Sequence, residues 1–127
     1  MKKLLILLFS ILISFNSYGE WTKLGENIDG DSYYIEFDTI KARNGYVYWW
    51  SLSDYITPNS SGDDMSAKFY FQGDCGLYRF KYLSGIFYKQ SMGMGENEII
   101  SPPNDWHYAV PKSAMKSEME YVCDYVE

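Results

Sequence analysis

The sequence has one histidine, His107, and only two cysteines. A serine or cysteine nucleophile needs a neighbouring base, and His107 carries the one imidazole ring that could act as that base. Its neighbours Trp106 and Tyr108 favour a packed loop residue over a catalytic one. The sequence also lacks a nucleophile-elbow motif, and a small hydrolase would need a cleft around His107. We therefore predict a protein that is not an enzyme, with no catalytic residues and no cofactor.

Hydrophobic runs are scarce too, since the one long run lies at the N-terminus. Lys2 and Lys3 precede the apolar stretch Leu4 to Ile13, and the small residues Ser17 and Gly19 follow it. This order is typical of a secretory signal peptide that is cut after a small residue. A membrane anchor is the alternative, but the run is shorter than the roughly 20 apolar residues that span a bilayer.

We therefore predict a signal peptide over residues 1–19 and one exported domain over residues 20–127. Removing the two leader lysines from the 11 basic residues leaves nine against 17 acidic residues, a net charge of −8. So acidic a domain repels nucleic acid and anionic membranes, which argues against both as partners. No membrane span is expected after cleavage, and the expected location is the periplasm or the cell surface.

Two cysteines in an exported chain predict one disulfide, Cys75–Cys123. The alternative is a pair of free, buried thiols. Cys123 lies in the one long stretch of the exported domain with a helical period, Pro111 to Tyr125. Pro111 is expected in the first turn of this helix. Its apolar face carries Met115, Met119, Val122, Cys123 and Val126.

Alternating segments separated by turn residues predict about six short strands. The expected ranges are 20–26, 33–37, 46–56, 65–71, 77–83 and 86–92. Asn44-Gly45 signals a hairpin, Ser84-Gly85 a tight turn, and Gly93 to Asp105 an irregular segment. The fold class is therefore α+β: a single antiparallel sheet of about six strands, with one C-terminal helix packed on it and joined to it by the disulfide.

Alternation also predicts which side chains point inward. On the longest strand we expect Tyr46, Tyr48, Trp50 and Leu52 to face the core, rather than Val47, Trp49, Ser51 and Ser53. On the next strand we expect Met65, Ala67, Phe69 and Phe71 to point inward, and Ser66, Lys68 and Tyr70 outward.

The 13 tyrosines exceed what the core of a small sheet can bury. Tyrosine is enriched at protein interfaces, because its ring is apolar and its tip is polar. One interpretation is a set of cross-strand pairs that stabilise the sheet; the other is a surface for a protein partner. The candidate contact surface consists of Tyr46, Tyr48, Trp49, Tyr70 and Tyr78.

One acidic turn resembles part of a calcium loop. Asn27, Asp29 and Asp31 place oxygen ligands at alternate positions, with Asp38 at the twelfth. A calcium loop of this kind needs glycine at its sixth position and helices on both sides, whereas Gly30 stands at the fourth. We therefore favour a polar hairpin turn and predict no metal site.

Several landmarks together resemble the surface-adhesin protein E family of small exported Gram-negative proteins. The landmarks are Trp21 to Gly25, Tyr34-Ile35-Glu36 with Asp38-Thr39-Ile40, Trp50-Ser51-Leu52 to Asp54-Tyr55, Asp74-Cys75 before Arg79, Trp106 before Pro111, and Cys123.

The resemblance implies an antiparallel sheet with a C-terminal helix tied to it by the cysteine pair. It also implies a protein-binding module whose partner is a host extracellular-matrix or serum protein, vitronectin among them, and a homodimer. The chain departs from the lipoprotein that names the family, because no lipid-attachment cysteine lies near the predicted cut. The alternative function is therefore that of a periplasmic accessory or envelope protein.

Overall fold

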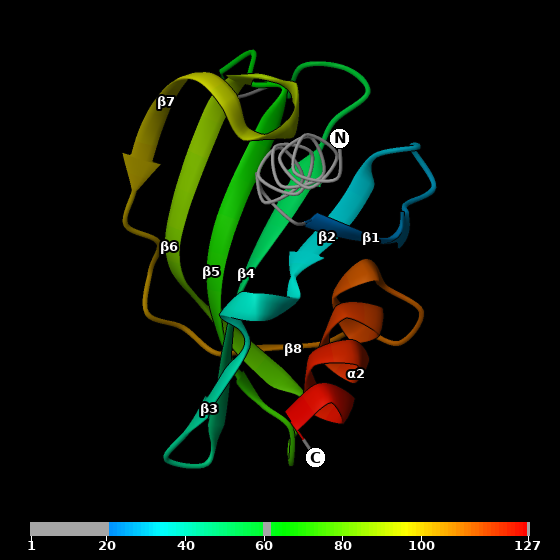
Figure 1. Cartoon of the computed structure of the whole chain (residues 1–127), viewed down its shortest axis with the longest axis vertical. Coiled ribbons are helices and arrows are strands. Elements are labelled where there is room, and N and C mark those ends of the chain that lie inside the picture. The colour runs from blue at the N-terminus through cyan, green and yellow to red at the C-terminus, as the bar shows by residue number, and fades with distance from the viewer. Residues whose placement is uncertain (1–20, 60–61, 127) are drawn as a thin grey trace, which may run out of the picture.

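The computed structural model describes residues 21–59 and 62–126, so the predicted signal peptide lies outside the described residues. In the described part, one antiparallel sheet carries a single α-helix, as predicted (Figure 1). The strand order is β1-β2-β4-β5-β6-β7, with β3 paired to β4 and β8 paired to β6. The strands are β1 (Trp21–Glu26), β2 (Ser32–Glu36), β3 (Lys41–Arg43), β4 (Tyr46–Asp54), β5 (Ser66–Asp74), β6 (Arg79–Gln90), β7 (Met94–Ile100) and β8 (His107–Tyr108). The helix is α2 (Ala114–Val126), and two short 3-10 turns are η1 (Phe37–Thr39) and η2 (Ser91–Gly93).

The hairpin signal at Asn44-Gly45 is confirmed between β3 and β4. Asn44 has φ 52° and Gly45 has φ 84°, the left-handed pair that a tight two-residue hairpin needs. The pairing of Arg43 with Tyr46 closes the turn directly. This hairpin projects at the lower end of the sheet in Figure 1.

The inward face of β4 was predicted wrongly, except that Leu52, expected in the core, is buried. Val47, Trp49 and Ser51 are buried on the side that faces α2, whereas Tyr46 and Tyr48 are partly exposed on the other side. Both sides of β4 carry large aromatic residues, so alternation alone could not choose between them. The choice is made by α2, whose Glu118 accepts a hydrogen bond from the indole of Trp49. The prediction for β5 holds at Ala67 and Phe71, which are buried; Ser66, expected outside, is buried as well.

Two predictions in the second half of the sheet were wrong. Ser84-Gly85 is not a turn, because β6 runs unbroken through it and pairs with β5 and β7. A Cβ at Gly85 would lie 2.8 Å from Ile100, so glycine here admits a neighbouring side chain instead of reversing the chain. Most of the segment predicted to be irregular forms the edge strand β7, whose exposed polar residues gave no alternating signal.

The helix begins three residues later than predicted. Ser113 caps it: its hydroxyl accepts a hydrogen bond from the N–H of Lys116 (3.1 Å). Pro111 therefore lies in the preceding turn and not in the first turn of α2. The predicted apolar face is confirmed at Met119, Val122 and Cys123, which are buried, while Val126 at the end is exposed.

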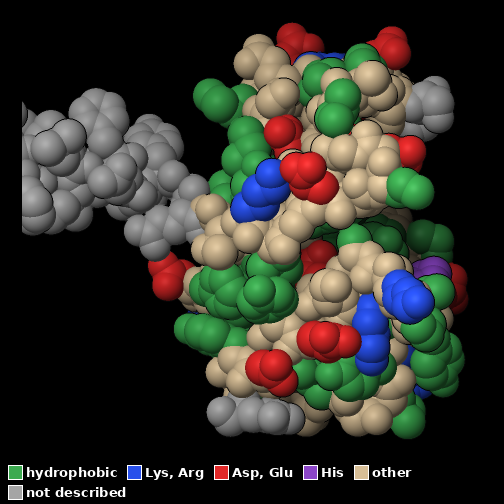
Figure 2. All heavy atoms as spheres, turned by 90° about the vertical axis from the view of Figure 1, so that its right-hand side faces the viewer, with side chains coloured by type: hydrophobic (Ala, Val, Ile, Leu, Met, Phe, Trp, Pro, Cys, Tyr) green, Lys and Arg blue, Asp and Glu red, His purple; other side chains and the backbone are tan. Residues whose placement is uncertain are grey.

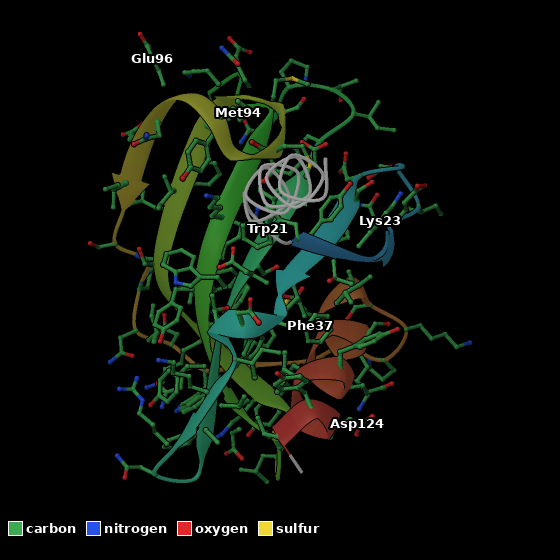
Figure 3. The ribbon with its side chains drawn as sticks, viewed as in Figure 1. Trp21, Lys23, Phe37, Met94, Glu96 and Asp124 are labelled. Atoms are coloured by element: carbon green, nitrogen blue, oxygen red, sulfur yellow. A yellow bond between two sulfur atoms is a disulfide. The ribbon has the colours of Figure 1, made fainter. Side chains whose placement is uncertain are left out.

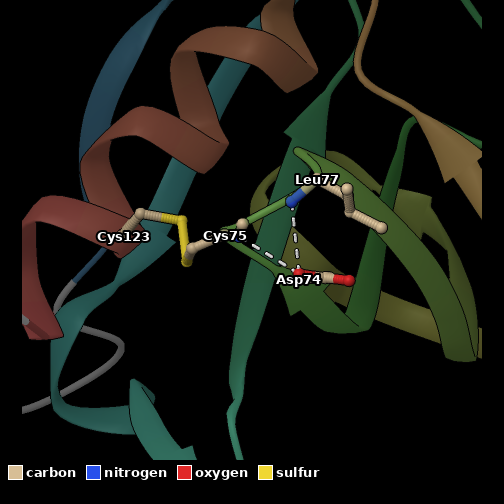
Figure 4. The surroundings of a disulfide bond; sticks show 5 residues. Asp74, Cys75, Leu77 and Cys123 are labelled. Atoms are coloured by element: carbon tan, nitrogen blue, oxygen red, sulfur yellow. Dashed lines mark hydrogen bonds between the residues drawn. A yellow bond between two sulfur atoms is a disulfide. The ribbon is translucent and has the colours of Figure 1, made fainter.

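The predicted disulfide joins Cys75 to Cys123, with their Cα atoms 5.8 Å apart (Figure 4). Cys75 follows β5 in a tight loop, where one carboxylate oxygen of Asp74 accepts hydrogen bonds from the N–H groups of Gly76 and Leu77. The bond therefore fixes the last turns of α2 against the loop between β5 and β6. The core beneath it includes Ile35, Val47, Trp49, Phe71, Phe80, Met119 and Val122.

Candidate functional site

The five residues of the predicted contact surface do not lie on one surface. Tyr46, Tyr48 and Tyr70 lie together on the side of the sheet that faces away from α2, and each is partly exposed. Trp49 is 0% exposed in the core, so its assignment to an exposed surface was wrong. Tyr78 lies in the loop between β5 and β6, with the ammonium of Lys116 3.5 Å from its ring centroid, on the helix side.

We call the side of the sheet away from α2 the outer face. Cross-strand register places Trp50 opposite Tyr70 there, with ring centroids 5.0 Å apart, and Tyr48 lies 6.2 Å from Tyr70. Tyr46 lies 5.7 Å from Trp106, which comes from the loop before β8. These rings form a band across β4, β5 and the β8 end of the sheet. Cross-strand pairing explains part of the tyrosine surplus, as one interpretation held.

Basic side chains accompany the aromatic band. The guanidinium of Arg43 lies 4.6 Å from the ring centroid of Tyr48. Arg79 and Lys81 lie 4.3 and 4.6 Å from the ring centroid of Trp106. Cation–π contacts of this kind hold basic groups against the faces of aromatic rings. By strand register, six of the nine basic residues in the range 20–127 lie on the outer face: Lys23, Lys41, Arg43, Lys68, Arg79 and Lys81.

A shallow hollow of about 220 Å³ lies at the other end of this face. Trp21 at the start of β1 borders it (Figure 3), and the ammonium of Lys68 lies 5.5 Å from the Trp21 ring centroid. Glu36 and Trp50 line it as well. The outer face therefore offers aromatic rings, basic groups and a concave end within one continuous side of the sheet.

A second, larger cavity lies on the opposite side, between the sheet and α2. Its volume is about 470 Å³, and its lining includes Tyr33, Tyr55, Tyr82, Phe69 and Glu118. In Figure 2 the surface is hollowed above α2 and below the β1–β2 region, with hydrophobic side chains at the edge of the hollow. Sequence analysis did not single out this cavity.

Glu118 is the one acidic side chain that lines the larger cavity, and it is 1% exposed. Burial raises its pKa to about 7, although hydrogen bonds from Ser51 and Trp49 act in the opposite direction. Burial also raises the pKa of Tyr55 to about 12, and it raises the pKa of Tyr33 and Tyr82, with the negative charge of Glu118 adding to both. The cavity therefore combines neutral phenols with one carboxyl group that titrates near neutrality.

The residues that sequence analysis considered and rejected as catalytic or metal-binding have structural explanations. His107 is exposed and stacks on Phe80, with ring centroids 5.6 Å apart. In the acidic turn, the side chains of Asn27 and Asp31 hydrogen-bond each other, and Asp31 also accepts from the N–H of Ile56. Residues 21–59 and 62–126 contain no group of three or more histidine, cysteine or acidic side chains placed to hold a metal ion.

Sequence reasoning missed the basic part of the outer face and the buried carboxyl group. Arg79 and Lys81 were visible as alternate residues of a strand, but their contact with Trp106 crosses more than twenty residues of chain. In the sequence, little distinguished Glu118 from the other acidic residues of the helix. Its position beside buried residues of the apolar helix face, Met119 and Val122, was the one available signal.

The sequence matches the family described as Surface-adhesin protein E over residues 21–124. Several solved structures share the fold. One crystal form of Haemophilus influenzae protein E has a TM-score of 0.62 and 19% identity, covering 86% of this chain and 91% of the other. The structure of protein E from non-typeable Haemophilus influenzae has a TM-score of 0.59 and 17% identity, covering 84% and 76%. A further Haemophilus influenzae protein E structure has a TM-score of 0.59 and 19% identity, covering 84% and 85%. No curated protein sequence matches.

The fold defines a small α+β protein with one antiparallel sheet and one helix packed on it. The chain belongs to the surface-adhesin protein E family. Membership indicates a surface adhesin with protein partners that is exported or displayed at the cell surface. Within residues 21–59 and 62–126, no helix has the length and apolar character to cross a membrane.

Proposed function

We propose that this protein is a non-enzymatic adhesin that binds a host extracellular-matrix or serum protein through the outer face of its sheet. The observation that carries the proposal is the band of Tyr46, Tyr48, Tyr70 and Trp106 with basic groups between the rings. Aromatic and arginine side chains supply most of the binding energy at protein interfaces.

The charge distribution supports an acidic partner segment. The exported domain carries a net charge of −8, yet most of its basic residues lie on the outer face. The same register places four acids on this side, Glu26, Glu36, Asp54 and Asp74, against the six basic residues. Two of these acids form ion pairs there, Glu26 with Lys23 (3.0 Å) and Asp74 with Arg79 (2.9 Å). Basic groups gathered on one face steer an acidic partner to it, while the acidic remainder disfavours other orientations.

The test is binding of the exported protein, residues 20–127, to a panel of immobilised matrix and serum proteins that includes vitronectin. We expect saturable binding to at least one member, and weaker binding as ionic strength rises, because exposed charges are screened within about 10 Å at 0.1 M salt. Retention of none of the panel would overturn the proposal. Retention that is indifferent to salt would overturn the role of the basic groups.

The rival location is tested separately. The predicted signal peptide and the lack of a lipid-attachment cysteine near the predicted cut are also compatible with a periplasmic envelope protein. Cell fractionation of the producing bacterium distinguishes the two, since an adhesin must appear at the surface or in the medium. A pool confined to the periplasm would contradict adhesion and support the rival.

A further inference from the structure

Glu118 is a buried acid without a basic partner. Its Oε1 accepts a hydrogen bond from Trp49 Nε1–H (2.8 Å), and the hydroxyl of Ser51 donates to the same carboxylate. None of the ion pairs formed among the described residues includes Glu118. The nearest lysine along α2, Lys116, has its ammonium over the ring of Tyr78 instead. A buried carboxylate held only by neutral donors is unfavourable while it is ionised, so it either takes up a proton or is stabilised by a cation.

The cavity beside Glu118 has the size and walls of a small-molecule site. Its volume of about 470 Å³ falls in the range of ligand pockets, roughly 300–1,000 Å³. Tyr33, Tyr55 and Tyr82 line it together with Phe69 and Phe71, so aromatic rings surround the approach to the acid. It lies on the helix side of the sheet, apart from the outer face that the proposed adhesin function uses.

We propose that this cavity binds a small organic cation, with its ammonium group near the Glu118 carboxylate and its apolar body against the aromatic walls. The ammonium group supplies the missing positive charge, and the faces of tyrosine and phenylalanine rings attract cations when water is excluded. An anionic ligand would be repelled by Glu118. A neutral ligand could bond to the hydroxyls of Tyr33 or Ser53 but would supply no positive charge to the ionised carboxylate.

Binding should depend on pH in a defined direction. The pKa of Glu118 is about 7, and the other titratable groups that line the cavity are the phenols of Tyr33, Tyr55, Tyr82 and Tyr108. Because Trp49 and Ser51, which face Glu118 from β4, carry no charge, Glu118 is the lining group whose charge changes between pH 6 and pH 8. A cation prefers the ionised carboxylate, so its affinity should fall roughly tenfold from pH 8 to pH 6.

The experiment titrates the exported protein with benzylamine, which is cationic at both pH values, and with benzyl alcohol, its neutral counterpart. The readout is the NMR signal of the indole N–H of Trp49, which donates to Glu118. We expect benzylamine to shift this signal saturably and more tightly at pH 8, with benzyl alcohol binding at least about tenfold more weakly. Equal affinity for the two compounds, or no saturable shift with benzylamine, would overturn the proposal.

Two variants distinguish the effect of the negative charge of Glu118 from an effect on folding. Glu118→Gln keeps an oxygen that can accept from Trp49 but removes the negative charge, and should weaken benzylamine binding at least about tenfold. Glu120→Gln removes a charge from an exposed position on the same helix and should leave binding unchanged. Equal binding by both variants would overturn the role of Glu118. If Glu118→Gln failed to fold, the pH dependence in the unaltered protein would still decide, because a pH-independent affinity contradicts the proposal.

Discussion

At the scale of single residues, the contact between Glu118 and Trp49 chooses the side of the sheet that becomes the core. The two residues are 69 positions apart, and both are buried in contact with one another. Trp49 therefore faces α2, and its strand neighbours Tyr48 and Trp50 face outward. The same contact places an acid where its ionised form is disfavoured.

The raised pKa of Glu118 predicts that stability falls as pH rises. A carboxyl group with a pKa of about 7 when folded and 4.5 when exposed binds more protons in the folded state between these values. Its contribution is fully present below pH 4.5 and is lost as pH rises through 7, a change of about 3 kcal/mol. Urea unfolding at intervals from pH 5 to pH 8 measures it. Glu118→Gln should flatten this slope and Glu120→Gln should keep it; an unaltered protein without the slope would contradict the assignment.

Gly73 gives a second prediction at this scale. A Cβ there would lie 2.8 Å from Trp49 and 3.0 Å from Val47, both buried and unable to move far. Gly73→Ala should therefore destabilise the protein by about 1–3 kcal/mol through overpacking. The matched control is Gly25→Ala, because no atom lies within 4 Å of a Cβ at that position. Similar midpoints of thermal unfolding for the two variants would show that the core under β5 is looser than described.

At the scale of elements, the secondary structures that depend on local sequence patterns could be predicted. The helix, the β3–β4 hairpin and the alternation in β5 follow from side-chain period and from Asn44-Gly45. The inward side of β4 and the strand β7 could not be predicted. The first depends on which side a distant helix packs, and the second on backbone pairing with β6 rather than on apolar residues. Tyr46, Tyr48 and Tyr70 could be named as candidates from composition, although alternation had assigned Tyr46 and Tyr48 to the core; their basic neighbours could not be found.

Loss of the disulfide should affect the folding of α2 before that of the strands. A helix of 13 residues is marginal in water without tertiary contacts, and Cys123 ties its last turns to the loop after β5. Replacing both cysteines by serine should destabilise the protein by about 2–5 kcal/mol. Hydrogen exchange should show lost protection in α2 first, because the strands keep their own ladders. Unchanged protection across residues 114–126 would mean that packing alone holds the helix.

At the scale of the whole molecule, the two sides of the sheet have different roles. The helix side carries the core, the disulfide and the cavity beside Glu118. The outer face carries the aromatic band and most of the basic residues of an otherwise acidic domain. Substitutions of the partly exposed rings on the outer face should therefore change partner binding more than folding stability, whereas substitutions of core residues on the helix side should do the reverse.

The most direct test of this account is the affinity of the double variant Tyr48→Ala/Tyr70→Ala for the matrix or serum protein that the exported domain retains most strongly. Surface plasmon resonance should show at least about a tenfold loss, because these rings lie at the centre of the outer face. Tyr125→Ala is the control, since Tyr125 is an exposed tyrosine at the end of α2, and it should bind as the unaltered protein does. Unchanged affinity in the double variant, with its fold intact by circular dichroism, would contradict the outer face as the binding surface.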